Sequence, residues 1–249
     1  MSNETQDKIE GRNPVMEALR AGREIDKILV KKGKPEGSVI PIIKKAKALG
    51  IVVQEVEKQK LDSISESDNH QGVIAYAAVH EYATVADILN RAKEKGEAPF
   101  VLICDKITDP HNLGSILRTA NCVGAHGIII PKRNSVGLNS TVAKTSAGAM
   151  EYTPVAKVTN IARTIDELKE QGMWIAGAQM DGEEMYKANL TGSIGIVIGS
   201  EGEGISRLVS EKCDFHVSIP MCGEINSLNA SVAASVLMYE VLRQRNIKK

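Results

Sequence analysis

The second part of the chain alternates between short apolar runs and longer stretches with helical spacing. Five runs rich in isoleucine and valine are expected to be strands: Val101–Asp105, Gly127–Pro131, Met173–Ala178, Ile194–Gly199 and Phe215–Pro220. Strands that alternate with helices predict an α/β fold, in which a mainly parallel sheet is covered by helices on both faces. Ligands bind such sheets beyond the carboxyl ends of the strands, so we expect the chemistry just after each run.

The first part of the chain predicts a smaller α/β unit. Val15, Ala18 and Leu19 lie at helical spacing after Pro14 and indicate a short helix. A strand, a lysine-rich helix and two further strands are expected at Ile28–Val30, Val39–Leu49, Ile51–Val53 and Gly72–Val79. Because 249 residues exceed the usual domain size, we expect a domain over residues 1–78, a linker and connecting helix over 79–98, and a second domain over 99–249.

The composition is that of an ordinary globular protein, with 43% hydrophobic and 25% charged residues. No apolar run approaches the ~20 residues that span a bilayer, and Met1–Glu10 lacks the basic and apolar regions of a secretion signal. We therefore expect a cytoplasmic protein with no membrane partner. The spacing of the four cysteines, Cys104, Cys122, Cys213 and Cys222, fits no zinc or redox motif. Packing roles are therefore favoured over a metal site formed by Cys213, His216 and Cys222, and no metal is expected.

Charge is balanced over the whole chain but not within it. Lysine and arginine total 31, as do aspartate and glutamate. Between Lys27 and Lys47, however, seven lysines face one acid, Glu36, for a net charge of +6. Such a cluster is either a solvated surface or a site for RNA phosphates. The candidate RNA contacts of this part of the chain are Arg12, Lys31, Lys32, Lys44 and Lys45.

Three segments of the second domain carry candidate chemistry, and the first follows its first strand. It reads Asp109-Pro-His-Asn-Leu-Gly-Ser-Ile-Leu-Arg-Thr-Ala120. Its apolar residues repeat at helical spacing, which places Asn112 and Arg118 on the opposite, polar side of the predicted helix. Asn112 could be a helix cap and Arg118 a surface charge. At the carboxyl end of a strand they could instead hold a phosphate and a ribose, because arginine offers a planar fork of donors.

The second segment is Ile194-Gly-Ile-Val-Ile-Gly-Ser-Glu-Gly-Glu-Gly-Ile205, a buried strand that opens into a glycine-rich loop. Glycines let a backbone approach a ligand closely. The pattern is neither the dinucleotide fingerprint nor a phosphate-binding loop. Glu201 and Glu203 also disfavour a polyanion directly on the loop, whereas a cationic sulfonium cofactor would tolerate the two acids.

The third segment is Ile219-Pro-Met-Cys-Gly-Glu-Ile-Asn-Ser-Leu-Asn-Ala-Ser-Val-Ala-Ala-Ser235, a polar turn followed by a helix of small residues. Asn226, Ser227 and Asn229 could serve only as helix caps. The small residues Ala230, Ala233 and Ala234 would let another backbone approach closely. They suit either a tightly packed core or a symmetric helix interface.

These three segments, in this order, resemble the signature motifs of the SpoU/TrmH branch of the SPOUT RNA methyltransferases. The resemblance covers residues of about Pro99 to Asn246, and Ile9-Glu-Gly-Arg-Asn-Pro-Val-Met-Glu-Ala-Leu19 is similar to the opening of family members that methylate a guanosine of 23S ribosomal RNA. It implies a deep trefoil knot in roughly the last 50 residues, an exception to ordinary chain threading. It also implies S-adenosylmethionine as cofactor, a homodimer, and methylation of a ribose 2′-hydroxyl.

Matching this sequence to the family's motifs implies roles for individual residues. The catalytic group comprises Asn112, Arg118, Glu201, Ser227 and Asn229. The cofactor contacts, mostly through backbone groups, comprise Ala178, Gly199, Gly204, Ile219 and Leu228.

The first domain resembles small α/β modules that bind structured RNA in ribosomal proteins. Transfer-RNA ribose methyltransferases of this branch generally lack such a module, so 23S ribosomal RNA ranks above transfer RNA as the expected substrate. A non-catalytic RNA-binding protein and a dinucleotide-binding oxidoreductase are the alternatives from other classes. The intact motifs disfavour the first, and the missing fingerprint disfavours the second.

Overall fold

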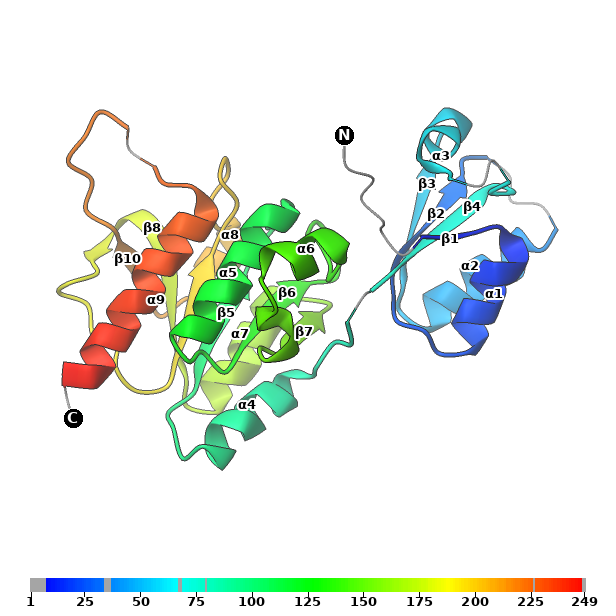
Figure 1. Ribbon diagram of the computed structural model, residues 1–249. Helices are drawn as coiled ribbons and strands as arrows, with labels where there is room; N and C mark the ends of the chain where they lie inside the picture. The colour runs from blue at the N-terminus through cyan, green and yellow to red at the C-terminus, as the bar shows by residue number, and fades with distance from the viewer. Residues whose placement is uncertain (1–7, 34–36, 67–68, 79, 226, 248–249) are drawn as a thin grey trace. The chain divides into compact units, whose positions relative to one another are not determined.

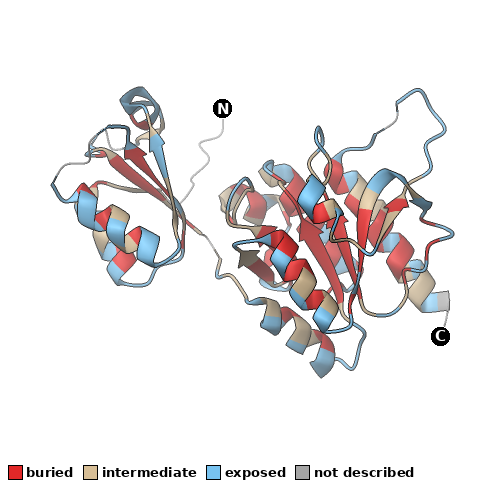
Figure 2. Cartoon of the chain, turned by 180° about the vertical axis from the view of Figure 1, so that it is seen from behind, coloured by how far each residue is buried: buried red, intermediate tan, exposed pale blue. Residues whose placement is uncertain are grey.

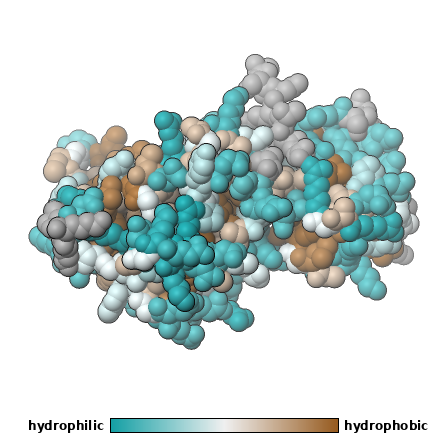
Figure 3. All heavy atoms as spheres, turned by 60° about the horizontal axis from the view of Figure 1, so that its bottom comes forward, coloured by the Kyte–Doolittle hydropathy of each residue, from teal (hydrophilic) through white to brown (hydrophobic). Residues whose placement is uncertain are grey.

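The computed structural model describes residues 8–33, 37–66, 69–78, 80–225 and 227–247, and the chain divides into two compact units (Figure 1). One unit comprises Met1–Glu81 with Gly137–Thr141, and the other comprises Tyr82–Val136 with Val142–Lys249. In both units the central strands are the most buried elements, and the helices keep an exposed side (Figure 2). On the face shown in Figure 3, hydrophilic residues predominate and apolar residues form separate patches, as expected where the cores are enclosed.

The first unit is a four-stranded mixed sheet in the order β1-β4-β2-β3, in which only the β2–β3 pair is parallel. Its core joins the sheet to helices α1 and α2 and includes the predicted Val15, Ala18 and Leu19. The elements are β1 (Lys8–Glu10), α1 (Arg12–Arg20), β2 (Ile25–Lys31), α2 (Val39–Ala48), β3 (Val52–Val56), α3 (Lys58–Ile64) and β4 (Val73–Ala77).

Three local features of this unit differ from the predictions. Helix α1 begins at Arg12, before Pro14, because proline is tolerated in the first turn of a helix. Strand β1 was not expected, since it has three residues and no apolar alternation. Helix α3 was also missed, because it is anchored by one buried side chain, Leu61, and therefore has no apolar repeat.

The second unit is a six-stranded parallel sheet in the order β10-β8-β9-β5-β6-β7, which confirms the predicted α/β fold. The five predicted strands are all present. Strand β7 was not predicted because it is a short edge strand of four residues that includes Lys157. The strands are β5 (Phe100–Cys104), β6 (Gly127–Pro131), β7 (Val155–Val158), β8 (Trp174–Glu184), β9 (Ile194–Ile198) and β10 (Phe215–Ser218).

Helices cover both faces of this sheet. Val101 and Ile103 of β5 pack in one core cluster with residues of α4 (Val85–Glu94), α7 (Ile161–Glu170) and α8 (Arg207–Ser210). Phe100 points to the other face because side chains alternate along a strand, and there it lies under Arg245 of α9 (Ala230–Ile247). Helix α5 (Pro110–Cys122) packs beside α9, while α6 (Ser140–Thr145) and the short 3₁₀ helix Ala149–Glu151 complete the unit.

Buried His126 lies between the start of β5 and the preceding linker. Its Nδ1 accepts a hydrogen bond from the backbone N–H of Phe100 at 2.9 Å, so Nε2 carries the proton and donates it to Glu97 at 3.1 Å. Burial lowers the pKa of His126 below its usual value of 6.5. A doubly protonated ring could not accept from Phe100, so the fold requires the neutral form.

We predict that His126 makes stability fall as the pH falls from about 7 to about 5. Below the usual pKa, the unfolded chain binds a proton that the folded chain does not, which favours unfolding until the lowered pKa is passed. Urea unfolding of the wild type and of His126→Gln at several pH values measures this effect. The free energy of unfolding should fall more steeply in the wild type, and parallel pH profiles for the two proteins would contradict the prediction.

Candidate active site

The loops that carry the three chemical segments meet at one edge of the parallel sheet. Strands β10, β8, β9 and β5 are consecutive neighbours, and their carboxyl ends point to the same edge because all the pairs are parallel. The loops that follow β5, β9 and β10 contain the first, second and third segments respectively. The predicted location of the chemistry, beyond the strand ends, is where the structure brings these segments together.

The carboxylate of Glu201 joins all three segments. Its Oε1 accepts a hydrogen bond from Nδ2 of Asn112 at 2.9 Å and a second, short one from Nδ2 of Asn229. These partners lie 89 and 28 positions away in the sequence. Hydrogen bonds to an ionised acceptor are about twice as strong as neutral ones, so Glu201 holds both amides firmly.

Asn112 is buried, with 6% of its surface exposed. Helical spacing predicted only that it lies on the polar side of α5, and its contact with the loop after β9 accounts for the burial. The cap of α5 is Asp109, whose side chain accepts from the backbone N–H of His111 at 2.9 Å, with Pro110 as the first helical residue. Asn112 is therefore not a helix cap, and its amide is directed to Glu201.

Asn229 caps helix α9 and also contacts Glu201. Its side-chain oxygen accepts from the backbone N–H of Ser231 at 3.0 Å and of Val232 at 3.3 Å, which caps helix α9. Its side-chain nitrogen is then free to donate to Glu201. Ser227 is exposed nearby in the sequence, and Asn226 lies outside the described residues.

The Gly-rich loop that carries Glu201 is closed on itself. The backbone groups of Ser200 and Gly204 exchange hydrogen bonds of 3.1 and 2.9 Å. Gly204 has a φ of 66°, which favours glycine. A Cβ on Gly199 would lie 2.0 Å from the carbonyl carbon of Gly204, so no larger residue fits there. The glycines are needed for the turn itself as well as for any ligand beside it.

A second set of contacts, which the sequence did not predict, ties this loop to the end of β5. Buried Asp105 accepts from the backbone N–H of Ser206 at 2.7 Å. Lys106 pairs with Glu203 at 2.8 Å, which raises the pKa of Lys106 and lowers the pKa of Glu203. Their position in the sequence could have indicated this role, because Asp105 and Lys106 directly follow a buried strand, where ligand-binding loops of parallel sheets begin. Glu203 is thus neutralised by a partner, while Glu201 binds only amides among the contacts described.

The predicted cofactor contacts lie on the loops of three adjacent strands. Strand β10 pairs first with Gly177 and then with Glu183, so residues 178–182 of β8 bulge out of the ladder, and Ala178 begins the bulge. Gly199 and Gly204 lie on the loop after β9, Ile219 directly follows β10, and Leu228 lies in the following turn with 37% of its surface exposed. The structure places these residues at one sheet edge. Small side chains and accessible backbone fit a cofactor held mainly by main-chain groups.

Arg118 is separate from the Glu201 contacts. It lies on α5 six residues after Asn112, which turns its side chain by about 120° around the helix. Arg118 is exposed, and within the described residues its side chain makes no hydrogen bond or ion pair. Its guanidinium is consequently available to a substrate rather than used for internal structure.

The candidate RNA contacts of the first unit are spread over several elements. Arg12 begins α1 and donates from Nε to the carbonyl of Gln71 at 3.0 Å. Lys32 pairs with Glu57 at 2.8 Å, which raises its pKa and offsets its charge. Lys31 ends β2, whereas Lys44 and Lys45 lie on α2; Lys34 and Glu36 of the cluster lie outside the described residues.

Other candidate chemistry finds little structural basis. Burial raises the pKa of the Cys104 and Cys213 thiols to about 12, so neither is a ready thiolate. Among the described residues no group of three or more histidine, cysteine or acidic side chains could hold a metal ion. Within the same part of the chain, no helix is long and apolar enough to cross a membrane.

Comparison with known proteins gives matches to two family models. Residues 99–239 match the SpoU rRNA Methylase family, and residues 8–83 match the RNA 2′-O ribose methyltransferase substrate-binding domain. The first match spans more than half of the chain and contains all three chemical segments. It leaves the oxidoreductase alternative without support.

Individual relatives extend over nearly the whole chain. The protein YacO of Bacillus subtilis, named as belonging to the TrmH family of tRNA/rRNA methyltransferases, is 50% identical over 96% of both chains. A solved RNA 2′-O ribose methyltransferase is 28% identical, with a TM-score of 0.55 over 95% of this chain and 88% of that one. The methyltransferase AviRb of Streptomyces viridochromogenes, solved with AdoMet, has the same fold at 24% identity, with a TM-score of 0.59 over 97% and 91% of the two chains. The chain, with its three motifs joined at Glu201, belongs to the SpoU/TrmH family of RNA methyltransferases.

Proposed function

We propose that this protein transfers the methyl group of S-adenosylmethionine to the 2′-hydroxyl of a ribose, that of a guanosine, in 23S ribosomal RNA in the cytoplasm. The observation that carries the proposal is the junction at Glu201, which brings Asn112 and Asn229 together at the carboxyl edge of the sheet. The guanidinium of Arg118, exposed on the same helix as Asn112 and without a partner among the described residues, supplies a donor for RNA.

The cofactor would lie against the loops that follow β8, β9 and β10. Backbone groups around Ala178, Gly199, Gly204, Ile219 and Leu228 would hold its adenine and ribose. When bound, S-adenosylmethionine supplies an activated methyl group on a sulfonium, and its positive charge is compatible with the nearby acids Glu201 and Glu203. Sequence reasoning and the family's solved relatives both support this cofactor.

The residues of this chain contribute positioning. The ribose 2′-oxygen would displace S-adenosylhomocysteine from the methyl carbon in line, and the 2′-hydroxyl proton would pass to solvent water. Holding the two reactants in this geometry supplies most of the rate gain. Arg118 acts as a hydrogen-bond donor to the ribose and a neighbouring phosphate, because a guanidinium is not deprotonated under ordinary conditions. Asn112, Ser227 and Asn229 line the same edge and orient the nucleotide.

Ribosomal RNA is favoured over transfer RNA by the first unit. Residues 8–83 match a substrate-binding domain of RNA 2′-O ribose methyltransferases. The exposed Lys31 and Lys44, together with Lys45 and Arg12, give this domain cations for a structured RNA. A whole domain for substrate binding suits a target that must be selected within a large folded RNA.

We also propose the deep trefoil knot at the carboxyl end. Helix α9 returns after β10 to pack on α5 and β9. Gln244 of α9 donates to the carbonyls of Met185 and Ala188 and accepts from the N–H of Leu190 at 2.9 Å. These bonds hold the end of α9 against the segment that joins β8 to β9, which supports a threaded arrangement.

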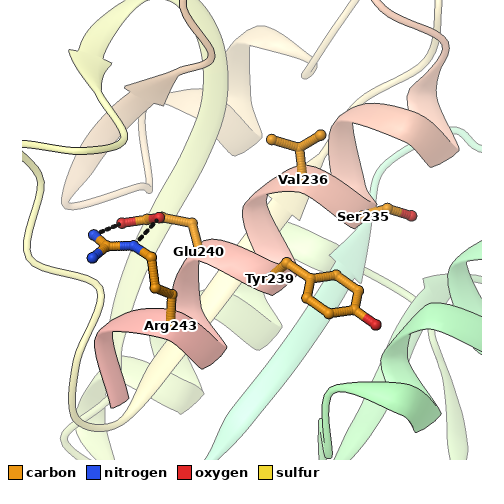
Figure 4. A pocket seen from close by; sticks show the side chains of 5 residues that line it. All are labelled: Ser235, Val236, Tyr239, Glu240 and Arg243. Carbon is orange, nitrogen blue, oxygen red and sulfur yellow. Dashed lines mark hydrogen bonds and ion pairs between the residues drawn. The ribbon is translucent and has the colours of Figure 1, made fainter. Parts of the chain in front are cut away.

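An exposed face of α9 supports a homodimer. Val232 and Tyr239 are 46% and 53% exposed on this helix. A cavity of about 510 Å³ is lined by Ser235, Val236, Tyr239, Glu240 and Arg243. Figure 4 shows these side chains projecting from α9, with the ion pair of Glu240 and Arg243 beside the apolar part. Exposed apolar surface of this kind is typical of an interface between proteins.

We predict methyl transfer to a 23S ribosomal RNA transcript in the presence of S-adenosylmethionine, with the methyl group on a guanosine 2′-oxygen. Arg118→Ala and Asn112→Ala should each lower turnover by about 100-fold or more, because each removes a group that positions the ribose. Radiolabel transfer followed by mapping of 2′-O-methylation measures this.

Calorimetry with S-adenosylmethionine controls for the cofactor site, since Arg118→Ala should keep wild-type affinity. Methylation of a transfer RNA transcript instead of 23S RNA would reject the proposed substrate. Variant turnover within a few-fold of the wild type would remove both residues from the active site.

We predict that Glu201→Ala lowers the free energy of unfolding by about 1–3 kcal/mol, because it leaves the buried amide of Asn112 without an acceptor. Glu201→Gln keeps an oxygen in the same place and should retain most of this stability and most of the activity. Urea unfolding and methyl transfer measure the two effects. A Gln variant as impaired as the Ala variant would show that the charge, and not the hydrogen bonds, is what matters.

We predict that the wild type sediments as a dimer of the 26.9 kDa chain at micromolar concentration. Tyr239→Glu should yield folded monomers with little activity, because it places an unpaired charge in the interface. Tyr152→Glu, at another exposed tyrosine of the same unit, is the matched control and should remain dimeric. A wild type of monomer mass would refute the dimer.

A further inference from the structure

A long span of the chain, most of which lies in the second unit, contains no acidic residue. From Pro110 to Met150 the sequence has four cations, Arg118, Lys132, Arg133 and Lys144, and neither aspartate nor glutamate. All 31 acids of the chain therefore lie outside this span, in a protein whose net charge is zero. Ion pairing within the span is impossible, so its cations need partners from elsewhere or remain free.

The fold brings the loop after β6 to the active-site edge. Lys132 and Arg133 directly follow β6, the neighbour of β5. The backbone N–H of Val136 and the hydroxyl of Ser135 both donate to the carbonyl of Ile107, at 2.9 and 3.0 Å. Ile107 lies in the loop between β5 and Asn112. The cations of one loop thus stand beside the loop that leads into the first chemical segment.

Helix α6 brings Lys144 to the side of α5 that carries Arg118. The contact is very close, because a Cβ on Gly114 of α5 would lie 1.8 Å from Oγ1 of Thr145. Gly114 and Arg118 are four residues apart and therefore lie on the same face of the helix. Thr145 therefore packs against the face of α5 that carries Arg118 one turn further on, and Lys144 precedes Thr145 in α6.

All four side chains are available to a ligand. Arg118, Arg133 and Lys144 are exposed, and Lys132 is half-buried. Within the described part of the chain, none of the four makes a side-chain hydrogen bond or an ion pair. Lys106 provides the contrast, because it also follows a strand at this edge but is paired with Glu203.

The charges at this edge are therefore divided. Glu201 and Glu203 lie on the loop after β9, and the exposed Asp109 caps α5 after β5. Lys132, Arg133 and Lys144, which have no side-chain partner among the described residues, lie on the β6 and α6 side. Asn112, held by Glu201, stands between the two groups. An acidic side suits a sulfonium, and a basic side suits phosphate groups.

We propose that Arg118, Lys132, Arg133 and Lys144 form a phosphate-binding surface that holds the RNA backbone on either side of the target ribose. The inference rests on the proposed function and assigns RNA contacts to the catalytic unit in addition to those of the first domain. Arginine binds phosphate through two parallel hydrogen bonds and lysine binds it as a point charge, so this surface recognises backbone and not base sequence. It fixes the register of the RNA, while selection of the nucleotide falls to other contacts.

The test compares two double variants of the full chain with the same loss of charge. Lys132→Gln with Arg133→Gln alters the proposed surface. Lys93→Gln with Lys95→Gln is the matched control, because these exposed lysines lie at the end of α4, on the opposite face of the sheet. Filter binding to unmodified 23S ribosomal RNA and transfer RNA transcripts is measured over a series of KCl concentrations.

The slope of log affinity against log salt should decrease by about 0.7–0.9 for each phosphate group that the variant no longer binds, and only in the surface variant. Lys144→Gln should add a further decrease of the same size. The KM for RNA should rise while the KM for S-adenosylmethionine stays unchanged, because phosphate groups are bound before the chemical step. Equal slopes for the surface and control variants would overturn the inference and identify the cations as a solvated face.

The outcomes separate this inference from the proposed function. If the wild type methylates neither RNA, but the surface variant binds with a reduced slope, the proposed substrate fails and the phosphate-binding surface stands. If the wild type methylates 23S RNA and the surface variant matches the control in slope and KM, the proposed function stands and the surface is rejected.

Discussion

The active-site edge depends on one carboxylate oxygen. Oε1 of Glu201 accepts from amides that belong to α5 and to the start of α9, two helices on the same face of the sheet. Asn112 is buried, so without this acceptor its amide would have no hydrogen-bond partner in a place that water does not readily reach. The same oxygen sets the position of Asn229, whose other side-chain atom caps α9. One carboxylate therefore fixes the relative places of three loops.

Glu201 can act in this way because several contacts hold its loop in place. The backbone exchange between Ser200 and Gly204 closes the loop, and Asp105 and Lys106 tie it to the end of β5. An exposed ion pair such as Lys106 with Glu203 contributes little stability by itself. Together with the buried bond from Ser206 to Asp105, it leaves the loop few alternative positions. Positioning of this kind is what catalysis by orientation requires.

The distribution of charged side chains around Asn112 connects this arrangement of loops to function. The two acids on the loop after β9, and the cations on the β6 side that have no side-chain partner among the described residues, present different electrostatic environments within one sheet edge. A methyl-transfer site must hold a positively charged donor and a negatively charged RNA at the same time. Acidic and basic side chains on separate loops would allow the site to hold both the cationic donor and the RNA, without placing a phosphate group beside Glu201.

Much of the architecture could be predicted from periodicity. The five strands of the parallel sheet and the lysine-rich helix α2 have apolar runs that match their structural period, and all were predicted. Strands β1 and β7 and helix α3 were missed because they are short and have few buried side chains. The three chemical segments were recognised as well, since each follows a predicted strand and departs from simple amphipathic spacing.

The sequence by itself determined the fold class, the three motifs and the roles that the family resemblance implies for them. Only the tertiary structure decided which residues touch. Helical spacing placed Asn112 on the polar side of one helix, but it could not show that a residue 89 positions further along would contact its amide there. Asp105 and Lys106 gained their roles in the same way, through partners that are distant in sequence. Local sequence patterns reflect backbone geometry and the side of each element that packs in the core. Contacts between loops depend on the order of the strands in the sheet, and that order exists only in the folded chain.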